Sequence, residues 1–156
     1  MKYVLFLYTE RDSDEAEELK DYLQVSRLRG VADMRNITGI FAEGQDFREE
    51  LRRSDCVVLI GSHGASTLIR EKKKEVDDDF ISFDGEVIHE ELTENQELVR
   101  DRLIIVFLKE RTNNDWLPDG FNEKRVFNLQ GGKIKEGPLL YQLEYSIRRV
   151  LLGPDI

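Results

Sequence analysis

The chain has 156 residues and a formal charge of −9, from 23 basic and 32 acidic side chains. Hydrophobic residues make up 40% and charged residues 35%, which predicts one globular domain over residues 1–156. The acidic balance argues against nucleic-acid binding, because that function needs cationic surface to displace counterions. The longest apolar run, residues 103–108, is far shorter than the roughly 20 residues that a membrane-spanning helix needs.

Cysteine and histidine are too rare to build a disulfide framework or a metal site. The one cysteine, Cys56, lies in an apolar run and is predicted to be a small buried hydrophobe. His63 and His89 lie in separate segments with no companion cysteine, so we expect no metal site. Residues 10–18 are strongly charged where a secretion signal would be apolar, so we expect a reducing, cytoplasmic setting.

The first elements follow from apolar patterning. Residues 3–8 form an unbroken apolar and aromatic run, which predicts a buried strand. A capping box starting at Asp12 and apolar residues at helical spacing predict a helix to about Gln24. A second short strand is predicted at residues 31–34, followed by a long polar loop at residues 35–45.

The segment 54–62, Ser-Asp-Cys-Val-Val-Leu-Ile-Gly-Ser, predicts the centre of a sheet. It follows a brief helix marked by Phe47 and Leu51, and its unbroken apolar run is typical of a strand buried on both faces. Ligands of open α/β sheets bind outside the carboxyl ends of such strands, so residues 61–66 should form one rim of any site. Their backbone N–H groups suit an anion, and the alternative is a tight turn that needs small residues.

The middle of the chain leaves alternatives open. Leu68 and Ile69 predict one helical turn, and residues 71–79 form a charge run that reads as a solvated loop or a helix end. The pair Asp84-Gly85 fits a type I′ hairpin between two apolar stretches. It fits equally well a helix that Asp84 caps.

The last part of the chain completes the pattern. Strands are predicted at residues 103–108 and 126–129, and a helix from Pro138 to a stop at Gly153. Strands and helices alternate with short connections, which predicts a single flavodoxin-like α/β domain. It should contain a parallel sheet of about five strands with helices on both faces.

Three glutamates are candidate functional residues. Glu86, Glu90 and Glu91 fall between the third and fourth predicted strands. A carboxylate in a cleft there can stabilise an oxocarbenium-like centre when a glycosidic bond breaks. The alternative is that all three belong to a solvated acidic helix face. No phosphate-binding glycine motif and no Gly-x-Ser-x-Gly elbow are present.

Four stretches, in this order, resemble the TIR and SEFIR superfamily of cytoplasmic signalling domains. The first strand with its polar turn, the second strand with its Gly39-Gly44 loop, and the Ser-Asp-apolar-Gly-Ser run are similar to that family. Glu86 to Leu92, then Arg102 to Leu108 with Trp116-Leu117-Pro118, resemble its SEFIR branch. The resemblance spans about the whole chain and implies that Asp84 begins a helix.

The first function that the resemblance implies is homotypic interaction in innate-immune-type signalling. Such domains self-associate and recruit related adaptor domains through a mobile segment called the BB loop. The matching positions in this chain are Asn36, Thr38, Gly39, Ile40, Phe41 and Gly44.

The second implied function is cleavage of NAD at the nicotinamide–ribose bond, with NAD as substrate and no required cofactor. Enzymatic members use a glutamate on the helix after the third strand. Distance to the next strand favours Glu86, whereas alignment of the family's Trp-Cys-x-x-Glu pattern, which is missing here, selects Glu91. The implied NAD pocket contains Tyr8, Thr9, Arg11, Phe41 and Ser62. Arg11 would contact a phosphate, and Tyr8 or Phe41 would stack on a base or on the nicotinamide ring.

Overall fold

The computed structural model describes residues 2–26, 28–36, 44–72, 83–93, 100–112, 114–129 and 137–153. Its centre is a five-stranded parallel sheet with the strand order β2-β1-β3-β4-β5. This order confirms the predicted flavodoxin-like class. The strands are β1 (Lys2–Leu7), β2 (Ala32–Asn36), β3 (Cys56–Gly61), β4 (Leu103–Phe107) and β5 (Val126–Asn128).

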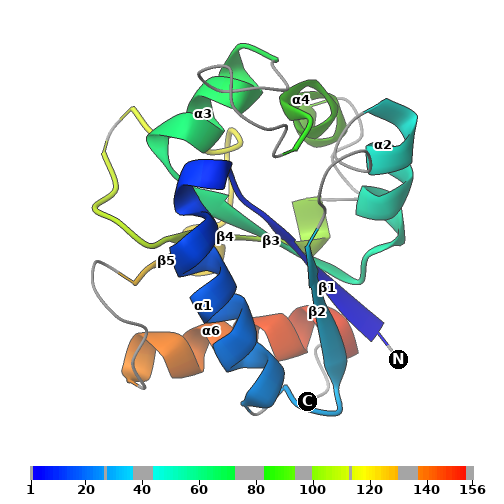
Figure 1. Ribbon diagram of the computed structural model, residues 1–156, viewed down its shortest axis with the longest axis vertical. Helices are drawn as coiled ribbons and strands as arrows, with labels where there is room; N and C mark the ends of the chain where they lie inside the picture. The colour runs from blue at the N-terminus through cyan, green and yellow to red at the C-terminus, as the bar shows by residue number, and fades with distance from the viewer. Residues whose placement is uncertain are drawn as a thin grey trace.

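Helices cover both faces of the sheet (Figure 1). One face carries α1 and α6, and the other carries α2, α3 and α4. The helices are α1 (Ser13–Val25), α2 (Gly44–Arg53), α3 (His63–Arg70), α4 (Gly85–Thr93) and α6 (Pro138–Leu152). Short 3-10 turns are η1 (Glu10–Asp12), η3 (Arg100–Arg102) and η4 (Glu123–Arg125). No helix in the described part of the chain is long and apolar enough to cross a membrane.

The central strand β3 supplies side chains to two separate cores. Cys56, Val58 and Ile60 pack with α1 and α6, whereas Val57 and Leu59 pack with the other three helices. Successive side chains of a strand point to opposite faces, so both sets must be apolar when both faces are covered. This explains the unbroken apolar run in the sequence.

Two helices differ from their predicted form. Helix α3 spans eight residues rather than one turn, because Ser62 caps it by accepting a hydrogen bond from the Ala65 N–H, and because Leu68 and Ile69 are buried. Asp12 stands at the N-cap position of α1 but makes no side-chain capping hydrogen bond. The predicted capping box is therefore wrong, since the Asp12 carboxylate is bonded elsewhere.

The alternatives at Asp84 are settled in favour of a helix. The Asp84 Oδ1 atom accepts hydrogen bonds from the Glu86 N–H at 3.1 Å and the Val87 N–H at 3.3 Å, as an N-cap residue does. The charge run after α3 lies largely outside the described residues, beyond Lys72. Strand β2 extends to Asn36, two residues into the predicted polar loop.

Cys56 provides a direct test of this core. Burial raises the pKa of its thiol to about 12, and the side chain is fully buried. Because the thiolate is the reactive form, we expect no labelling of the native protein by a thiol reagent at about pH 8, and complete labelling in denaturant. Mass spectrometry of the labelled protein measures this. Rapid labelling of folded protein, checked by circular dichroism, would contradict the buried placement.

Candidate functional site

The site that the fold offers lies where β1 and β3 end side by side. β1 pairs with β2 on one side and with β3 on the other, and later strands extend the sheet from β3. The chain direction across the sheet therefore reverses between β1 and β3. In open α/β folds the ligand crevice lies outside the carboxyl ends of the strands at such a reversal.

A buried carboxylate organises this edge. The Thr9 hydroxyl donates to the Asp12 Oδ2 atom at 2.8 Å, and the Ser62 hydroxyl donates to the same atom at 2.7 Å. Thr9 is 3% exposed and Asp12 is 7% exposed. We call Thr9, Asp12 and Ser62 the Asp12 cluster. Its negative charge makes the rim after β3 unfavourable for an anion. Neither predicted alternative describes residues 61–66 fully, because Gly61 ends β3, Ser62 is an N-cap residue and α3 begins at His63.

Helix α3 begins close to the end of β1 at this edge. A Cβ atom at Gly64 would lie 3.5 Å from both Cγ2 and Oγ1 of Thr9, which is ordinary van der Waals contact. The first turn of α3 therefore sits directly against the end of β1. This proximity brings Ser62 within reach of Asp12.

A second polar group anchors the end of β2. The Asn36 amide donates to the Tyr8 hydroxyl and to the Glu17 Oε1 atom, both at 2.6 Å, and the Tyr8 hydroxyl also donates to Glu17. Burial alone would raise the pKa of Glu17, but hydrogen bonds from Tyr8, Lys20 and Asn36 outweigh it, so the pKa lies below its ordinary value. Asn36, where the predicted BB loop begins, is thus held by Tyr8, which follows β1, and by Glu17 of α1.

The structure brings together only part of the predicted pocket. Thr9 and Ser62 meet through Asp12, and Tyr8 is half-buried with its hydroxyl engaged. Arg11 is exposed on η1. The other predicted pocket residue, Phe41, lies outside the described residues.

The predicted interaction loop is described only at its two ends. Asn36 is the last residue of β2, and Gly44 is the first residue of α2. Between them, Thr38, Gly39, Ile40 and Phe41 lie outside the described residues.

Glu86 is exposed in the first turn of α4. Helix α4 packs beside α3, the helix that Ser62 caps. Within the described part of the chain, no hydrogen bond or ion pair involves the Glu86 carboxylate, and none joins it to the Asp12 cluster. The described residues of the chain also contain no group of three or more histidine, cysteine or acidic side chains that could hold a metal ion.

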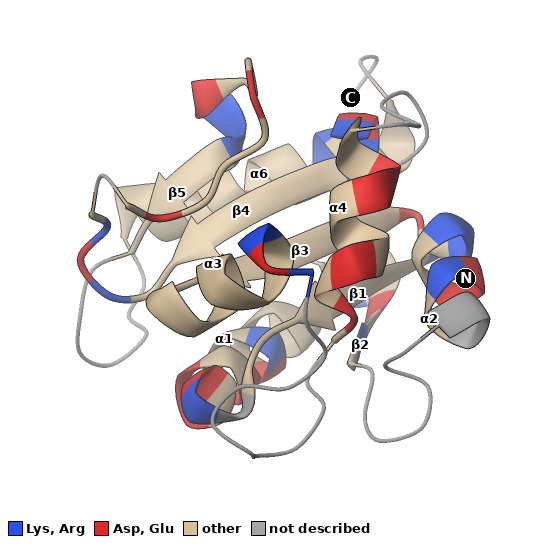
Figure 2. Ribbon diagram, turned by 90° about the horizontal axis from the view of Figure 1, so that it is seen from above, with Lys and Arg blue, Asp and Glu red and all other residues tan. Residues whose placement is uncertain are grey.

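Glu91 occupies a different environment on the same helix. It is fully buried, and its Oε1 atom pairs with Arg48 Nη1 at 2.7 Å and with Arg52 Nη2 at 2.8 Å. Arg48 also pairs with Glu90, and this hydrogen bond raises the pKa of Arg48. The alternative of a wholly solvated acidic face is therefore wrong for Glu91. We call these four residues the α2–α4 ion network; Figure 2 shows the acidic segments of α4 and the basic end of α2.

The sequence predicted neither Asp12 as the centre of the cluster nor the two arginines of the ion network. Asp12 was expected to cap α1, which is the common use of aspartate before a helix. Arg48 and Arg52 precede Glu91 by 43 and 39 residues, so no local pattern connects them. The sequence of α2 is rich in charged residues, but this pattern did not identify a partner on another helix.

Comparison with known proteins identifies the fold. No protein-family model matches the sequence, and no curated protein matches it either. Among solved structures, the chain is similar to one described as a prokaryotic SEFIR domain, with 12% sequence identity and a TM-score of 0.56. The similarity covers 98% of this chain and 100% of that one. The chain therefore has a SEFIR-like fold, as the resemblance in its sequence predicted.

Proposed function

We propose that this chain is a cytoplasmic signalling domain that works by self-association and by recruiting related domains. The observation that carries the proposal is the structural similarity to a prokaryotic SEFIR domain over almost the full length of both chains. The proposed interaction surface is the BB loop, residues 36–44. The partners are other TIR or SEFIR domains, either copies of this chain or adaptors.

The described ends of that segment support the proposal. Asn36 is held by hydrogen bonds to Tyr8 and Glu17, and α2, which begins at Gly44, is held to α4 by the α2–α4 ion network. A binding segment whose ends are fixed loses less conformational freedom when a partner binds. Both anchors would therefore favour association.

Sedimentation velocity over a wide range of protein concentration tests the proposal. We expect the sedimentation coefficient to rise with concentration and Phe41→Glu to suppress the rise, because a charge would be desolvated in the interface. Val25→Glu is the matched control, since Val25 is 72% exposed at the end of α1. A wild-type protein that stays monomeric and ignores related domains would refute the proposal.

A second candidate function is NAD cleavage with Glu86 as the catalytic carboxylate. The exposed position of Glu86 beside α3 supports it, and the engagement of Glu91 with Arg48 and Arg52 favours Glu86 over Glu91. In this reaction the bond between nicotinamide and ribose breaks, and water adds to the ribose carbon. The carboxylate would stabilise the positive charge that develops on the ribose.

Nicotinamide release from concentrated protein incubated with NAD tests this second function. We expect Glu86→Ala to lower the rate at least a hundredfold, as loss of one electrostatic stabiliser commonly does. Glu18→Ala, which removes an exposed carboxylate from α1, should leave the rate unchanged. Absence of product from the wild-type protein would exclude the activity, whereas equal rates for Glu86→Ala would exclude only this residue.

A further inference from the structure

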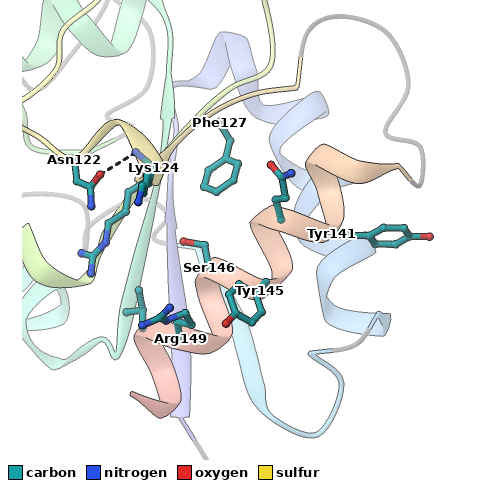
Figure 3. A pocket seen from close by; sticks show the side chains of 10 residues that line it. Asn122, Lys124, Phe127, Tyr141, Tyr145, Ser146 and Arg149 are labelled. Atoms are coloured by element: carbon teal, nitrogen blue, oxygen red, sulfur yellow. Dashed lines mark hydrogen bonds between the residues drawn. The ribbon is translucent and has the colours of Figure 1, made fainter. Parts of the chain in front are cut away.

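A groove of about 790 Å³ lies between η4 with β5 and the outer side of α6 (Figure 3). It is separate from the Asp12 cluster. η4 precedes β5, so it lies at the amino end of that strand. The Lys2 Nζ atom donates a hydrogen bond to the Leu151 carbonyl, which places the last turn of α6 beside the start of β1. Both walls of the groove therefore lie towards the amino ends of the strands. The Asp12 cluster lies at the carboxyl ends of the strands, on the opposite edge of the sheet.

The groove is cationic in a chain that is acidic overall. Its lining includes Lys124, Arg125 and Arg149 and contains no aspartate or glutamate, although the chain has 32 acidic residues against 23 basic ones. Figure 3 shows Ser146 and Arg149 extending from α6 towards the η4 side, with Phe127 between the two walls. Tyr141 points away from it.

Two of the three cations have no anionic partner among the described residues. Lys124 is exposed, and its acidic neighbour Glu123 pairs with Arg111 at 3.3 Å. The Arg149 guanidinium lies over the Tyr145 ring, 6.0 Å from its centroid, without a carboxylate. The third cation, Arg125, donates to backbone carbonyls of η3 and serves the fold.

The remaining lining gives the groove an apolar and aromatic part. The Phe127 side chain, 7% exposed, and the aliphatic Val150 line it together with the Ser146 hydroxyl. The Tyr145 ring is 53% exposed beside Arg149, so one face can receive a planar group. Asn122 and Gln142 add two amide side chains to the lining. The volume of the groove lies in the range that is typical of a small-molecule site.

We propose that this groove binds a small organic phosphate that carries a planar aromatic ring. The phosphate would bridge Lys124 and Arg149 and accept a hydrogen bond from Ser146, and the ring would lie against Tyr145 and Phe127. The edge strand β5 has only three residues, which leaves little backbone for an extended acidic peptide to pair with. This proposal does not depend on the proposed signalling or NAD-cleaving functions.

An NMR titration of the ¹⁵N-labelled chain with adenosine monophosphate, adenosine and inorganic phosphate tests the proposal. We expect the monophosphate to shift the amide signals of Lys124 and Ser146, and to bind at least tenfold more tightly than either fragment, because only it engages both parts of the groove. Added salt should weaken its binding. Shifts centred on Thr9 and Ser62 would overturn the proposal, because they would place the ligand at the Asp12 cluster.

Matched variants separate the groove from general charge effects. Lys124→Gln combined with Arg149→Gln should weaken binding of adenosine monophosphate at least tenfold. Arg53→Gln combined with Lys109→Gln makes the same change in net charge at exposed sites and should leave the affinity unchanged. Equal affinity for both double variants, no binding by the wild-type chain, or tighter binding of a glutamate-rich peptide at this groove would each overturn the proposal.

Discussion

Replacing Arg48 by methionine is expected to lower the free energy of unfolding by about 3 kcal/mol. The change removes one of the two guanidinium groups that pair with the Glu91 carboxylate, which is fully buried, and leaves that charge with Arg52 alone. Breaking one side of a buried ion pair costs about 3–5 kcal/mol, because the remaining charge is desolvated without full compensation. Arg52 remains, so the lower end of that range applies. Urea denaturation followed by circular dichroism measures the change.

A double-mutant cycle isolates the ion pair from other effects of the substitution. Adding Glu91→Leu to Arg48→Met should recover part of the lost stability, because it removes the buried charge and supplies apolar volume beside Leu92. Arg53→Met is the matched control, since the Arg53 side chain is 64% exposed and pairs only with Glu50 among the described residues. A stability of Arg48→Met within about 0.5 kcal/mol of the wild type would show that the network contributes little.

Replacing Gly61 by alanine is expected to destabilise the fold by about 1–3 kcal/mol, the usual cost of overpacking a core. A Cβ atom at Gly61 would lie 2.6 Å from Cζ and 2.8 Å from Cδ1 of the Phe107 ring. Phe107 is the residue opposite Gly61 on β4, and it is 1% exposed, so its ring has little room to move. The lower chain entropy of alanine in the unfolded state favours the variant only slightly.

Relief of the clash distinguishes steric overlap from an effect on the backbone. Combining Gly61→Ala with Phe107→Leu should cost less than the sum of the two single changes, because leucine vacates the space that the ring fills. Gly64→Ala is the control, because its Cβ would make only ordinary contacts with Thr9 and alanine favours the helix. Additive free energies for the Gly61 and Phe107 changes would contradict the steric account.

The sequence predicted the sheet well because its signals are local. Three apolar runs correspond to the central strands β1, β3 and β4, and two shorter, mixed stretches correspond to the edge strands β2 and β5. The terminal helix was equally clear, since Pro138 occupies its first position and Gly153 follows its last residue. The resemblance to SEFIR domains then resolved Asp84, where two local rules favoured different structures.

The parts that the sequence did not predict depend on contacts between distant residues. Asp12 has the local signature of a helix cap, but the hydroxyl of Ser62, fifty residues later, draws its carboxylate away. The predicted length of α3 was too short because its apolar residues are few. Burial against β3 and α4 stabilises the additional turn. Burial of Glu91 likewise depends on arginines of another helix. Such partners become visible only when the chain is folded.

The Asp12 cluster has a consequence for how the domain unfolds. Asp12 stands at the start of α1, which packs on one face of the sheet, and Ser62 caps α3, which packs on the other. The Oδ2 atom of Asp12 thus connects, through hydrogen bonds, segments that belong to the helical layers on opposite faces of the sheet. If α3 separated from its core, the Asp12 carboxylate at the start of α1 would lose its hydrogen bond from Ser62. The two layers are therefore expected to open as one cooperative unit.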